Sequence, residues 1–352
     1  MGCMMMQAII IAGGLGTRLK PVTDYCPKPA LPIMGKPFLD YQLELLKRIG
    51  VKRVVFSLMY LADKIMKIFG DGSQYGMEFH YAVEESPLGT GGGIKNCEKY
   101  LLDEPTVIFN GDVLTDIDLN QVIDFHINQN AKITIVMTPV DDPTMYGVIF
   151  TERDGRILRF LEKPKREEAT QNTINAGIYI YERDVFEHIP PGQNYSVERQ
   201  LYPDMLDEGY RLSGYKSSDY WLDIGTPEKY MKAHWDLMDG RINLPIGGRQ
   251  VQAGIWVGRD MVAGQDEVLK RSNLKPPLYI GYGAQFDGAS ELGPYVVLNE
   301  NVKLRGKVKA SRAIFLDYSS AHGDAEIENS IVHYQAEIMN GAEIKNVGIY
   351  VS

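Results

Sequence analysis

A glycine-rich run near the start of the chain carries the first residues whose types and spacing could do chemistry. Gly13–Arg18 reads GGLGTR and directly follows the apolar run Ala8–Ala12. Backbone N–H groups in such a turn can approach a phosphate group closely. The run is neither a dinucleotide fingerprint nor a P-loop, because Leu19 occupies the third glycine position and no Gly-Lys-Ser/Thr follows. Taken alone, it is equally compatible with a structural tight turn. The candidate nucleotide-binding residues here are Ala12, Gly13, Gly14, Gly16 and Thr17.

Two cations stand close behind this turn. Arg18 ends it, and Lys28 lies between the prolines of Pro27–Pro29. Arginine offers a planar fork to phosphate oxygens, and lysine offers a point charge. Prolines on both sides of Lys28 restrict its backbone and should hold the lysine in a defined place. Arg18 and Lys28 are therefore candidates for holding phosphate groups.

Two aspartates are candidate metal ligands. Asp112 follows the apolar run Thr106–Phe109, and Asp223 lies among apolar neighbours in Tyr220–Gly225. A half-buried carboxylate needs a cation or hydrogen-bond donors as partner. Mg²⁺ prefers one or two carboxylates together with phosphate oxygens and water, which these two acids and a triphosphate would supply. Each acid is equally compatible with a structural role such as capping.

Short apolar runs alternate with helix-period segments through most of the chain. The predicted strands are Ala8–Ala12, Arg53–Ser57, Thr106–Phe109 and Ile133–Met137. Phe38–Ile49 and Leu119–Gln129 have the apolar spacing of helices that pack one face on a sheet. This alternation predicts an α/β fold with a doubly wound, mostly parallel sheet. Ligands of such sheets bind at the carboxyl ends of the strands, where the glycine-rich turn and Asp112 stand.

The sequence pattern changes near Gly240. Segments with helical spacing end there, and isolated apolar residues separated by turn-forming residues follow. From Ile280 to Leu304 an apolar residue returns every six positions, and the spacing resumes at Ile338. We predict a hexapeptide-repeat, left-handed parallel β-helix, with an ordinary β-domain of alternating strands as the alternative. The expected domains are a catalytic domain over residues 1–240 and the β-helix over residues 241–352. We expect the β-helix to add little to the chemistry but to join subunits into a homo-oligomer, because the ends of a short solenoid must be covered.

The composition argues against several classes of protein. A net charge of −9 over 352 residues gives no broad positive field, so nucleic acid is not an expected partner. Three cysteines, Cys3, Cys26 and Cys97, form no C-x-x-C pair, which fits neither a zinc site nor a disulfide framework. No apolar stretch approaches membrane-spanning length, and the start lacks the basic region of a signal peptide. We expect a cytoplasmic protein without a membrane partner.

Together these motifs resemble those of the sugar-phosphate nucleotidylyltransferases, most closely the GDP-mannose pyrophosphorylases. The resemblance begins with Gly13–Leu19 and Pro27–Pro29. It continues in the family's order through Pro87–Gly91, Asn110–Asp112, Tyr146–Val148, Glu162–Pro164, Asn175–Tyr179 and Trp221–Gly225. It implies a Rossmann-like catalytic domain in which a nucleoside triphosphate and a sugar 1-phosphate form a nucleoside-diphosphate sugar and pyrophosphate.

The resemblance also implies roles for individual residues. It assigns Mg²⁺ to Asp112 and Asp223, the phosphate of the sugar substrate to Lys163, and sugar hydroxyls to Glu162. Carboxylate and amide groups suit hydroxyls because they offer acceptors and donors in fixed geometry. The other sugar-binding candidates are Gly147, Asn175 and Gly177, and those near the nucleobase are Glu84, Leu88, Gly89 and Thr90. Without the resemblance, the charged stretch before Glu162 would indicate a solvated face, and Glu162 with Lys163 would be a surface ion pair.

Nucleotidyl transfer needs an in-line approach of the sugar phosphate oxygen to the α-phosphorus, with little covalent help from the protein. We therefore expect electrostatic catalysis by Arg18, Lys28 and Lys163, with Mg²⁺ and without a protein nucleophile. One alternative is a UTP- or dTTP-dependent enzyme for glucose-type or heptose 1-phosphates. Another is a non-catalytic regulatory relative that binds nucleotide. A third is an acyltransferase with His322 or His333 as its base.

Glu84 is the candidate reader of the base. It begins the loop Glu84–Thr90, directly after the predicted strand Phe79–Val83. Guanine presents two neighbouring donors, which an ionised carboxylate accepts together, whereas uracil and thymine place a single donor between two carbonyl oxygens. Glu84 should therefore favour GTP. The alternative is that Glu84 and Glu85 are solvated loop charges and that backbone groups of Leu88–Thr90 read the base.

Overall fold

The computed structural model describes residues 6–258, 273–287 and 289–351, and within these the chain forms two compact units. The sheet unit contains residues 6–15 and 39–221, and the solenoid unit contains the described residues of 16–38 and 222–351. Cys3 lies outside the described residues. The boundary predicted at residue 240 is based on the change in sequence pattern. The compact units instead divide the chain after residue 221 and group residues 16–38 with the C-terminal part.

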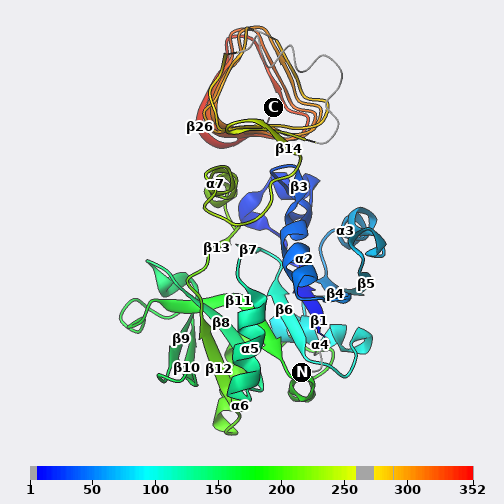
Figure 1. Cartoon of the computed structure of the whole chain (residues 1–352), viewed down its shortest axis with the longest axis vertical. Helices are drawn as coiled ribbons and strands as arrows, with labels where there is room; N and C mark the ends of the chain where they lie inside the picture. Colours follow the sequence, from blue (N-terminus) through cyan, green and yellow to red (C-terminus); the bar gives the residue numbers. More distant parts are fainter. Residues whose placement is uncertain (1–5, 259–272, 288, 352) are drawn as a thin grey trace. The chain divides into compact units, whose positions relative to one another are not determined.

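A nine-stranded mixed sheet forms the centre of the sheet unit (Figure 1). Its main path runs β10-β9-β11-β6-β1-β4-β5, and β8 joins β11 and β12. The strands are β1 (Gln7–Ile11), β4 (Arg53–Leu58), β5 (Glu78–Val83), β6 (Thr106–Asn110), β8 (Ile133–Pro139), β9 (Gly147–Thr151), β10 (Ile157–Glu162), β11 (Thr173–Tyr181) and β12 (Leu212–Lys216). The short strand β7 (Val113–Thr115) follows β6.

The predicted α/β architecture is confirmed, although strand direction is mixed. β6, β1, β4 and β5 are parallel neighbours, as are β8 and β12. β11 runs antiparallel to both β6 and β8. Apolar runs reveal buried strands on either side of β11 but do not encode the direction in which each strand is traversed.

Alternate residues of the central strands are buried on opposite faces of the sheet. Ile9, Val55 and Ile108 belong to one apolar core, which Ile94 and Cys97 of α4 (Gly89–Cys97) complete. Ala8 and Ile10, which point the other way, are buried as well. Burial on both faces explains why these strands read as continuous apolar runs.

The two helices expected from apolar spacing are present. α2 (Phe38–Arg48) buries Leu39, Leu43 and Leu46, and Gly50 follows it with a left-handed φ of 82°. α5 (Leu119–Gln129) has the predicted limits, and the Asp118 carboxylate caps it by accepting from the Asn120 N–H at 3.0 Å. The remaining α-helices among the described residues of the sheet unit are α3 (Ala62–Phe69) and α6 (Tyr202–Asp207), and its short 3-10 and π helices are η3 (Ser73–Tyr75), η4 (Glu98–Tyr100), η5 (Pro143–Met145), η6 (Arg183–His188) and η7 (Val197–Leu201).

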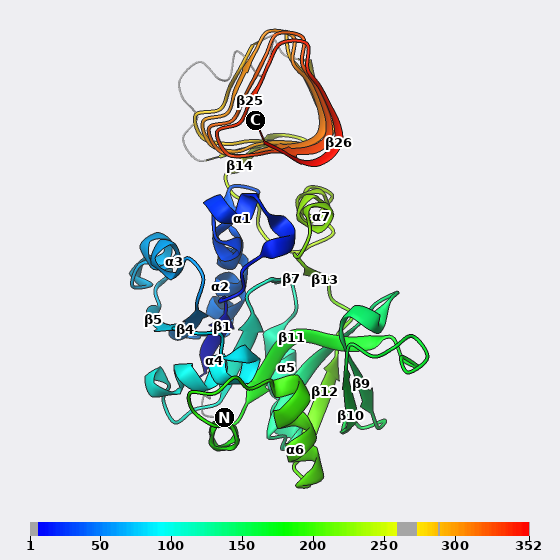
Figure 2. The same ribbon diagram turned by 180° about the vertical axis from the view of Figure 1, so that it is seen from behind.

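The solenoid unit contains a parallel β-helix with a triangular cross-section, seen end-on in Figures 1 and 2. β14 (Arg249–Gln252) runs antiparallel to β15 (Ile255–Val257), whose other neighbour is parallel. The further described strands, all in parallel pairs, are β16 (Asn273–Leu274), β17 (Leu278–Ile280), β18 (Gln285–Phe286), β19 (Glu291–Leu292), β20 (Val296–Leu298), β21 (Lys303–Arg305), β22 (Lys309–Phe315), β23 (Ser320–His322), β24 (Glu326–Val332), β25 (Glu337–Ile338) and β26 (Glu343–Tyr350).

Paired residues give the length of each coil of the β-helix. Leu278 pairs with Val296 eighteen residues on, whereas Leu304 pairs with Ala321 and Ala321 with Ile338 at steps of seventeen. An eighteen-residue coil holds three six-residue steps, which accounts for the regular apolar spacing as far as Leu304. A coil of seventeen contains one step of five residues, as from Ala310 to Phe315 and from Ile327 to Val332, and each such step shifts the six-residue spacing.

Residues 16–38 and one long helix complete the solenoid unit. The helix α7 (Pro227–Met238) follows β13 (Trp221–Asp223), and Thr226 caps it with Pro227 at the first helical position, as that residue pair predicts. The segment itself contains only short elements, namely η1 (Thr17–Leu19), α1 (Val22–Tyr25), η2 (Lys28–Ala30), β2 (Pro32–Ile33) and β3 (Lys36–Pro37).

Candidate functional site

The carboxyl edge of the sheet brings the first predicted residues together. β1 and β6 are parallel neighbours in which Ile11 faces Asn110, so the glycine-rich turn and Asp112 leave the sheet at the same edge. The Gly111 N–H donates to the Ile11 carbonyl at 2.8 Å. A Cβ at Gly111 would lie 2.7 Å from that oxygen, so glycine is needed for this close approach. Gly111 also lies against Ala12, and Asp112, which follows it, is half-buried.

Glu84 directly follows β5, and hydrogen bonds hold its side chain in place. Its carboxylate accepts from the Ser57 hydroxyl at 2.9 Å and from the Leu88 N–H at 3.0 Å. A Cβ at Gly93 would come within 2.8 Å of the carboxylate, so the glycines of α4 make room for it. Glu85 beside it is exposed. Glu84 thus has a fixed orientation, and each of its oxygens keeps a further lone pair for a ligand.

Thr90 is tied to a segment that the sequence did not single out. Its hydroxyl donates to Glu198 at 2.7 Å, and the Ser196 hydroxyl donates to the same carboxylate at 2.7 Å. The backbone of Leu88 pairs with that of Tyr195, whose N–H donates to the Leu88 carbonyl at 2.9 Å. The start of α4 is therefore held by hydrogen bonds from two directions.

Strand β10 ends at Glu162, which pairs with Gly147, and Lys163 follows it. A Cβ at Gly147 would lie 3.0 Å from a carboxylate oxygen of Glu162, and closer still to the Phe160 ring. Burial, and then the negative charge of Glu198, raise the pKa of the Glu162 carboxyl. Lys163 has a φ of 48°, in the left-handed region that few residues with a side chain adopt. Such backbone conformations cluster at functional sites.

Asn175 and Gly177 shape a bulge in β11. The Asn175 side chain accepts from the Gly177 N–H at 2.9 Å and donates to the Tyr179 hydroxyl at 2.9 Å. The pairing of β11 with β8 shifts register between Asn175 and Tyr179. Gly177 has a φ of 73°, and a Cβ there would lie 2.7 Å from the Asn110 amide. Gly177 therefore meets the Asn110–Asp112 turn at the same sheet edge.

The solenoid unit holds the other predicted residues. The Arg18 guanidinium lies against Gly225, where a Cβ would be 2.7 Å from Nη2. Arg18 and the Asp223–Gly225 turn are thus neighbours. Gly16 has a φ of 60°, and its carbonyl accepts from the Thr23 hydroxyl at 3.0 Å, which folds the chain back after Thr17. Lys28 is half-buried between the buried prolines Pro27 and Pro29.

Asp223 has a cationic partner on α7. The Lys229 ammonium donates to its carboxylate, and the Asp223 side chain is 16% exposed. Lys229 lies one turn into the helix that Thr226 caps. The carboxylate thus has the partner that a half-buried charge requires. Within the described residues, no group of three or more His, Cys, Asp and Glu side chains is placed to hold a metal ion.

Several of these contacts could not be foreseen from motifs. Ser57, Glu198 and Lys229 meet site residues through tertiary packing, and no local spacing marks them. Ser196 carries a weak signal, since its hydroxyl accepts from the Arg199 N–H as an N-cap would. His322 and His333 lie on the β-helix, where His322 contacts Glu337 at 3.0 Å and His333 contacts the Tyr334 carbonyl at 3.1 Å.

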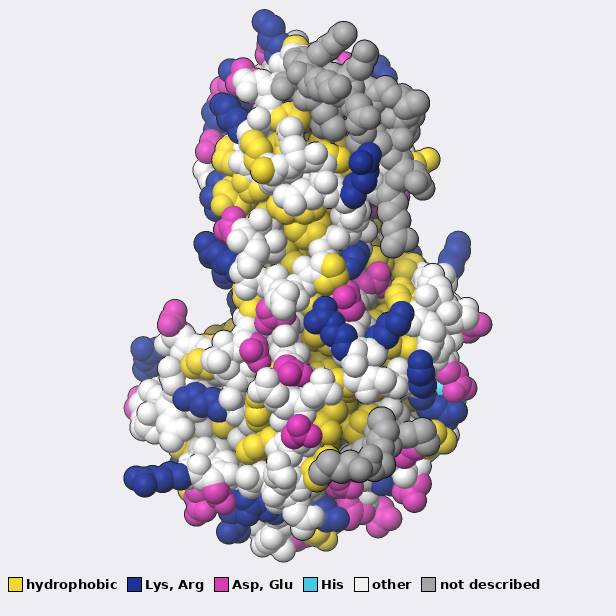
Figure 3. All heavy atoms as spheres, in the orientation of Figure 1, with side chains coloured by type: hydrophobic (Ala, Val, Ile, Leu, Met, Phe, Trp, Pro, Cys, Tyr) yellow, Lys and Arg dark blue, Asp and Glu magenta, His cyan; other side chains and the backbone are white. Residues whose placement is uncertain are grey.

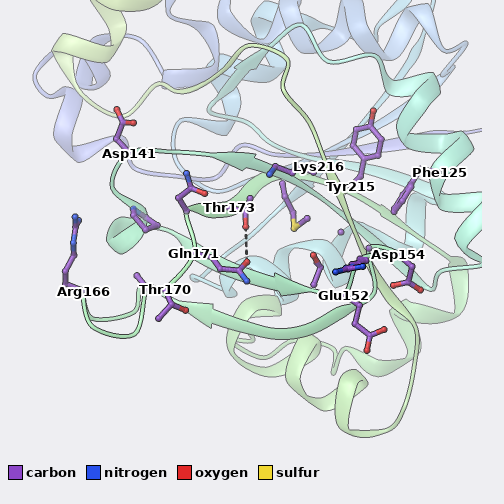
Figure 4. A pocket seen from close by; sticks show the side chains of 18 residues that line it. Phe125, Asp141, Glu152, Asp154, Arg166, Thr170, Gln171, Thr173, Tyr215 and Lys216 are labelled. Atoms are coloured by element: carbon purple, nitrogen blue, oxygen red, sulfur yellow. Dashed lines mark hydrogen bonds between the residues drawn. The ribbon is translucent and has the colours of Figure 1, made fainter.

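A broad surface pocket of about 880 Å³ in the sheet unit is lined by other residues (Figure 4). Phe125, Tyr215 and Lys216 line one side, and Gln171 and Thr173 line another. None of its lining residues was predicted to bind nucleotide or sugar. On the face shown in Figure 3, Lys and Arg side chains are interspersed with Asp and Glu side chains. Among the described helices, none is long and apolar enough to cross a membrane.

Comparison with known proteins places these motifs in context. Residues 7–240 match the family described as nucleotidyl transferase. The chain is 40% identical over 290 residues to a mannose-1-phosphate guanylyltransferase of Mycobacterium tuberculosis, covering 81% of this chain and 79% of that one. It is 32% identical over 342 residues to a UTP–glucose-1-phosphate uridylyltransferase of Synechocystis, covering 93% and 87% of the two chains.

A solved structure supports the same grouping. The crystal structure of HddC from Yersinia pseudotuberculosis complexed with GMP-PN matches 66% of this chain and 99% of its own, with a TM-score of 0.55 and 34% identity. The fold, the order of the motifs and the family match agree.

Proposed function

This chain belongs to the nucleotidyl transferase family, and we propose that it is a mannose-1-phosphate guanylyltransferase that joins GTP to mannose 1-phosphate and releases pyrophosphate. It is a sugar nucleotidyltransferase. The main support for the proposal is that Asp112, Gly177 and the glycine-rich turn lie at the same carboxyl edge of the sheet. Guanine and mannose are favoured by the identity with the mycobacterial relative.

The reaction is a single displacement at the α-phosphorus of the triphosphate. An oxygen of the sugar phosphate forms the new P–O bond while the bond to the departing pyrophosphate breaks, and the electron pair leaves with pyrophosphate. Backbone amides of Gly13–Thr17, with Arg18 and Lys28, hold the triphosphate. Lys163 holds the attacking phosphate. The reaction is then accelerated by the positioning of the two substrates and by stabilisation of the developing charge, and no side chain acts as nucleophile.

Glu162 with Gly147, and Asn175 with Gly177, form the proposed sugar pocket. A carboxylate already partly desolvated beside Glu198 gains by accepting hydrogen bonds from hydroxyl groups. The left-handed backbone of Lys163 turns this residue out of strand β10, where its side chain is 58% exposed. Lys163 is therefore accessible to a substrate phosphate.

Mg²⁺ is the proposed metal, with Asp112 and Asp223 as its protein ligands. The donor set fits the ion, because two carboxylates leave the remaining positions to phosphate oxygens and water, as Mg²⁺ prefers. The ion would supply positive charge to the triphosphate oxygens. The pairing of Lys229 with Asp223 means that this lysine competes with the metal for the carboxylate.

Glu84 is the proposed reader of guanine. Its contacts with Ser57 and Leu88 support a fixed carboxylate at the start of the base loop. Glu84→Gln should move the preference from GTP toward UTP and dTTP, since an amide can donate to a pyrimidine carbonyl while it still accepts from N3–H. An unaltered ratio of rates would dismiss Glu84 as the reader and leave the backbone of Leu88–Thr90.

A second candidate function is uridylyl or thymidylyl transfer to a glucose-type or heptose 1-phosphate. The identity with the cyanobacterial uridylyltransferase over nearly the whole chain favours it as the runner-up. The third candidate, a regulatory relative, has no need of Asp112, Asp223 and three phosphate-binding cations.

One experiment separates these functions. The purified chain is incubated with Mg²⁺ and each of four triphosphates against mannose, glucose and heptose 1-phosphates, and pyrophosphate release is measured. We expect the highest rate with GTP and mannose 1-phosphate. A preference for UTP or dTTP would support the second candidate, and no release with any pair would support a regulatory protein.

Assembly into a homo-oligomer through the β-helix is also proposed. The end strand β26 leaves Val347 46% exposed, and Met339 beside the last coil is 64% exposed. Sedimentation of the full chain should give a species larger than a monomer, and a monomer at micromolar concentration would contradict the proposal. The cytoplasmic location expected from the sequence stays a prediction.

A further inference from the structure

The segment 16–38 carries Arg18 and Lys28 but has little regular structure of its own. Its helical elements have three or four residues each, and its two strands have two residues each. Elements this short make few internal hydrogen bonds and depend on packing against something else. The two proposed triphosphate cations therefore stand on a segment whose position is set from outside.

The β-helix provides one attachment, at Tyr25. The Tyr25 ring stacks on the Tyr334 ring, with centroids 4.4 Å apart and planes inclined by 20°. The Gln335 amide donates to the Tyr25 hydroxyl at 3.2 Å, and the His333 ring meets Tyr25 edge-on at 6.3 Å. Tyr25 lies between Arg18 and Lys28 in sequence, three residues before the lysine.

The β-helix side of this contact is firmly held. Tyr334 is 5% exposed, in the turn between β24 and β25. The N–H of the preceding residue, His333, donates to the Tyr350 carbonyl of the next coil at 3.0 Å. Burial, together with the neighbouring Cys26 thiol, raises the pKa of the Tyr334 hydroxyl. Tyr334 is thus a fixed support rather than a mobile surface side chain.

A second attachment lies at the far end of the segment. Gly35 has a φ of 76°, and its Cβ position is taken by the Tyr279 hydroxyl of β17, so no other residue fits. The Met34 carbonyl accepts from the Gly247 N–H at 2.9 Å. The Tyr230 hydroxyl of α7 donates to the Pro32 carbonyl. The segment is therefore anchored on both sides of Lys28.

We propose that the β-helix is a positioning element for nucleotide binding, and that the stacked pair Tyr25–Tyr334, here called the tyrosine clamp, sets the place of Arg18 and Lys28. The inference rests on the proposed function and departs from the expectation that the β-helix adds little to the chemistry. Tyr25 and Tyr334 are positioning residues, because they act through the two cations.

The test compares variants of the full chain. Tyr25→Ala and Tyr334→Ala should each raise the KM for GTP by about two- to tenfold, the change that loss of one aromatic pair can produce. The KM for mannose 1-phosphate should stay unchanged, because Lys163 and Glu162 lie in the sheet unit. Tyr334→Phe should behave as wild type, since it keeps the ring. The double alanine variant should be no worse than either single variant, because the clamp is lost once.

Hydrogen exchange supplies a readout that does not depend on turnover. Amides of residues 16–31 should exchange faster in Tyr25→Ala than in wild type. In the control variant Tyr282→Ala, which changes a tyrosine that is 49% exposed on the same β-helix, they should exchange at the wild-type rate. Tyr25 is 42% exposed, so its replacement leaves the β-helix folded even where Tyr334→Ala does not. Unchanged exchange and an unchanged KM for GTP in Tyr25→Ala would overturn the clamp. If wild type releases no pyrophosphate, the proposed function fails, and the exchange measurement still decides the clamp.

Discussion

The sheet unit and the segment 16–38 of the solenoid unit support their functional residues in different ways. In the sheet unit, Asp112 follows the end of strand β6, and Glu162 is the last paired residue of strand β10. In the segment, Arg18 and Lys28 stand on short turns that side chains of α7 and the β-helix hold from outside. The strand ends are positioned by the sheet to which their own strands belong. The segment depends on distant contacts, such as that of Tyr25 with Gln335, 310 residues later in the chain.

The two kinds of support should differ in how well they keep functional residues in place when distant residues are changed. Residues at a sheet edge inherit the rigidity of a core buried on both faces. Residues on a docked segment can be displaced by changes far away in the sequence. The sheet unit should therefore tolerate surface changes elsewhere, while nucleotide binding should respond to the state of the β-helix.

The largest expected effect comes from the two aspartates, one in each unit. Asp112→Asn and Asp223→Asn keep the side-chain shape but remove the charge that a metal needs, so pyrophosphate release should fall by at least about 10²–10³ in both. Thermal unfolding checks that the variants remain folded, and Asp63→Asn, on an exposed position of α3, serves as control. Near-native rates in both variants would remove the proposed metal site.

The lysines should divide the two substrates between the units. Lys28→Gln should raise the KM for GTP and Lys163→Gln the KM for mannose 1-phosphate, each by about 10–100-fold, as expected for a lost hydrogen bond to a charged group. Initial rates with one substrate varied at a time measure both constants. If Lys28→Gln changed only the sugar phosphate constant, the assignment of the segment to the triphosphate would be wrong.

Stability should respond to pH through an acid of the β-helix. Burial raises the pKa of Asp317 to about 6 from 3.8, so the folded protein binds this proton more tightly than the unfolded chain. The contribution of this group to stability is therefore fully present below pH 3.8 and is lost as the pH rises through about 6, a change of about 3 kcal/mol. Asp317→Asn should remove that slope in denaturant unfolding at several pH values, and an identical slope would contradict the assignment.

The smallest expected effect concerns the metal. Lys229→Met removes the cation that pairs with Asp223, so the Mg²⁺ concentration for half-maximal rate should fall by about three- to tenfold. Lys232→Met is the matched control, because Lys232 pairs with Asp236 on the same helix. Binding of Mn²⁺ followed by electron paramagnetic resonance gives the affinity directly. Equal metal affinity in both variants would show that Lys229 does not compete.

Much of the fold followed from the sequence because its signals are local. The limits of α5 and the N-cap Thr226 came from residues adjacent in the chain. The antiparallel direction of β11 did not, since alternation and burial are the same in either direction. The seventeen-residue coils interrupt the six-residue spacing, and only the paired residues explain the interruption.

The site was predictable to the extent that motifs mark it. Gly111 and Gly177 lie in motifs, and the structure gives the reason, which is close backbone or side-chain approach at each position. Ser57, Glu198 and Tyr334 carry no motif, because a hydroxyl, a carboxylate or a ring becomes a support only once the fold brings it beside its partner. Sequence patterns identify groups that contact ligands better than groups that hold them.

Phosphorus nuclear magnetic resonance of one reaction mixture measures both substrates and both products of the proposed guanylyl transfer. The purified full chain, GTP, mannose 1-phosphate and Mg²⁺ are followed with time. We predict that the resonances of GDP-mannose and pyrophosphate grow in equal amounts while those of GTP and mannose 1-phosphate decline together. Inorganic phosphate formed from GTP with mannose 1-phosphate unchanged would contradict it.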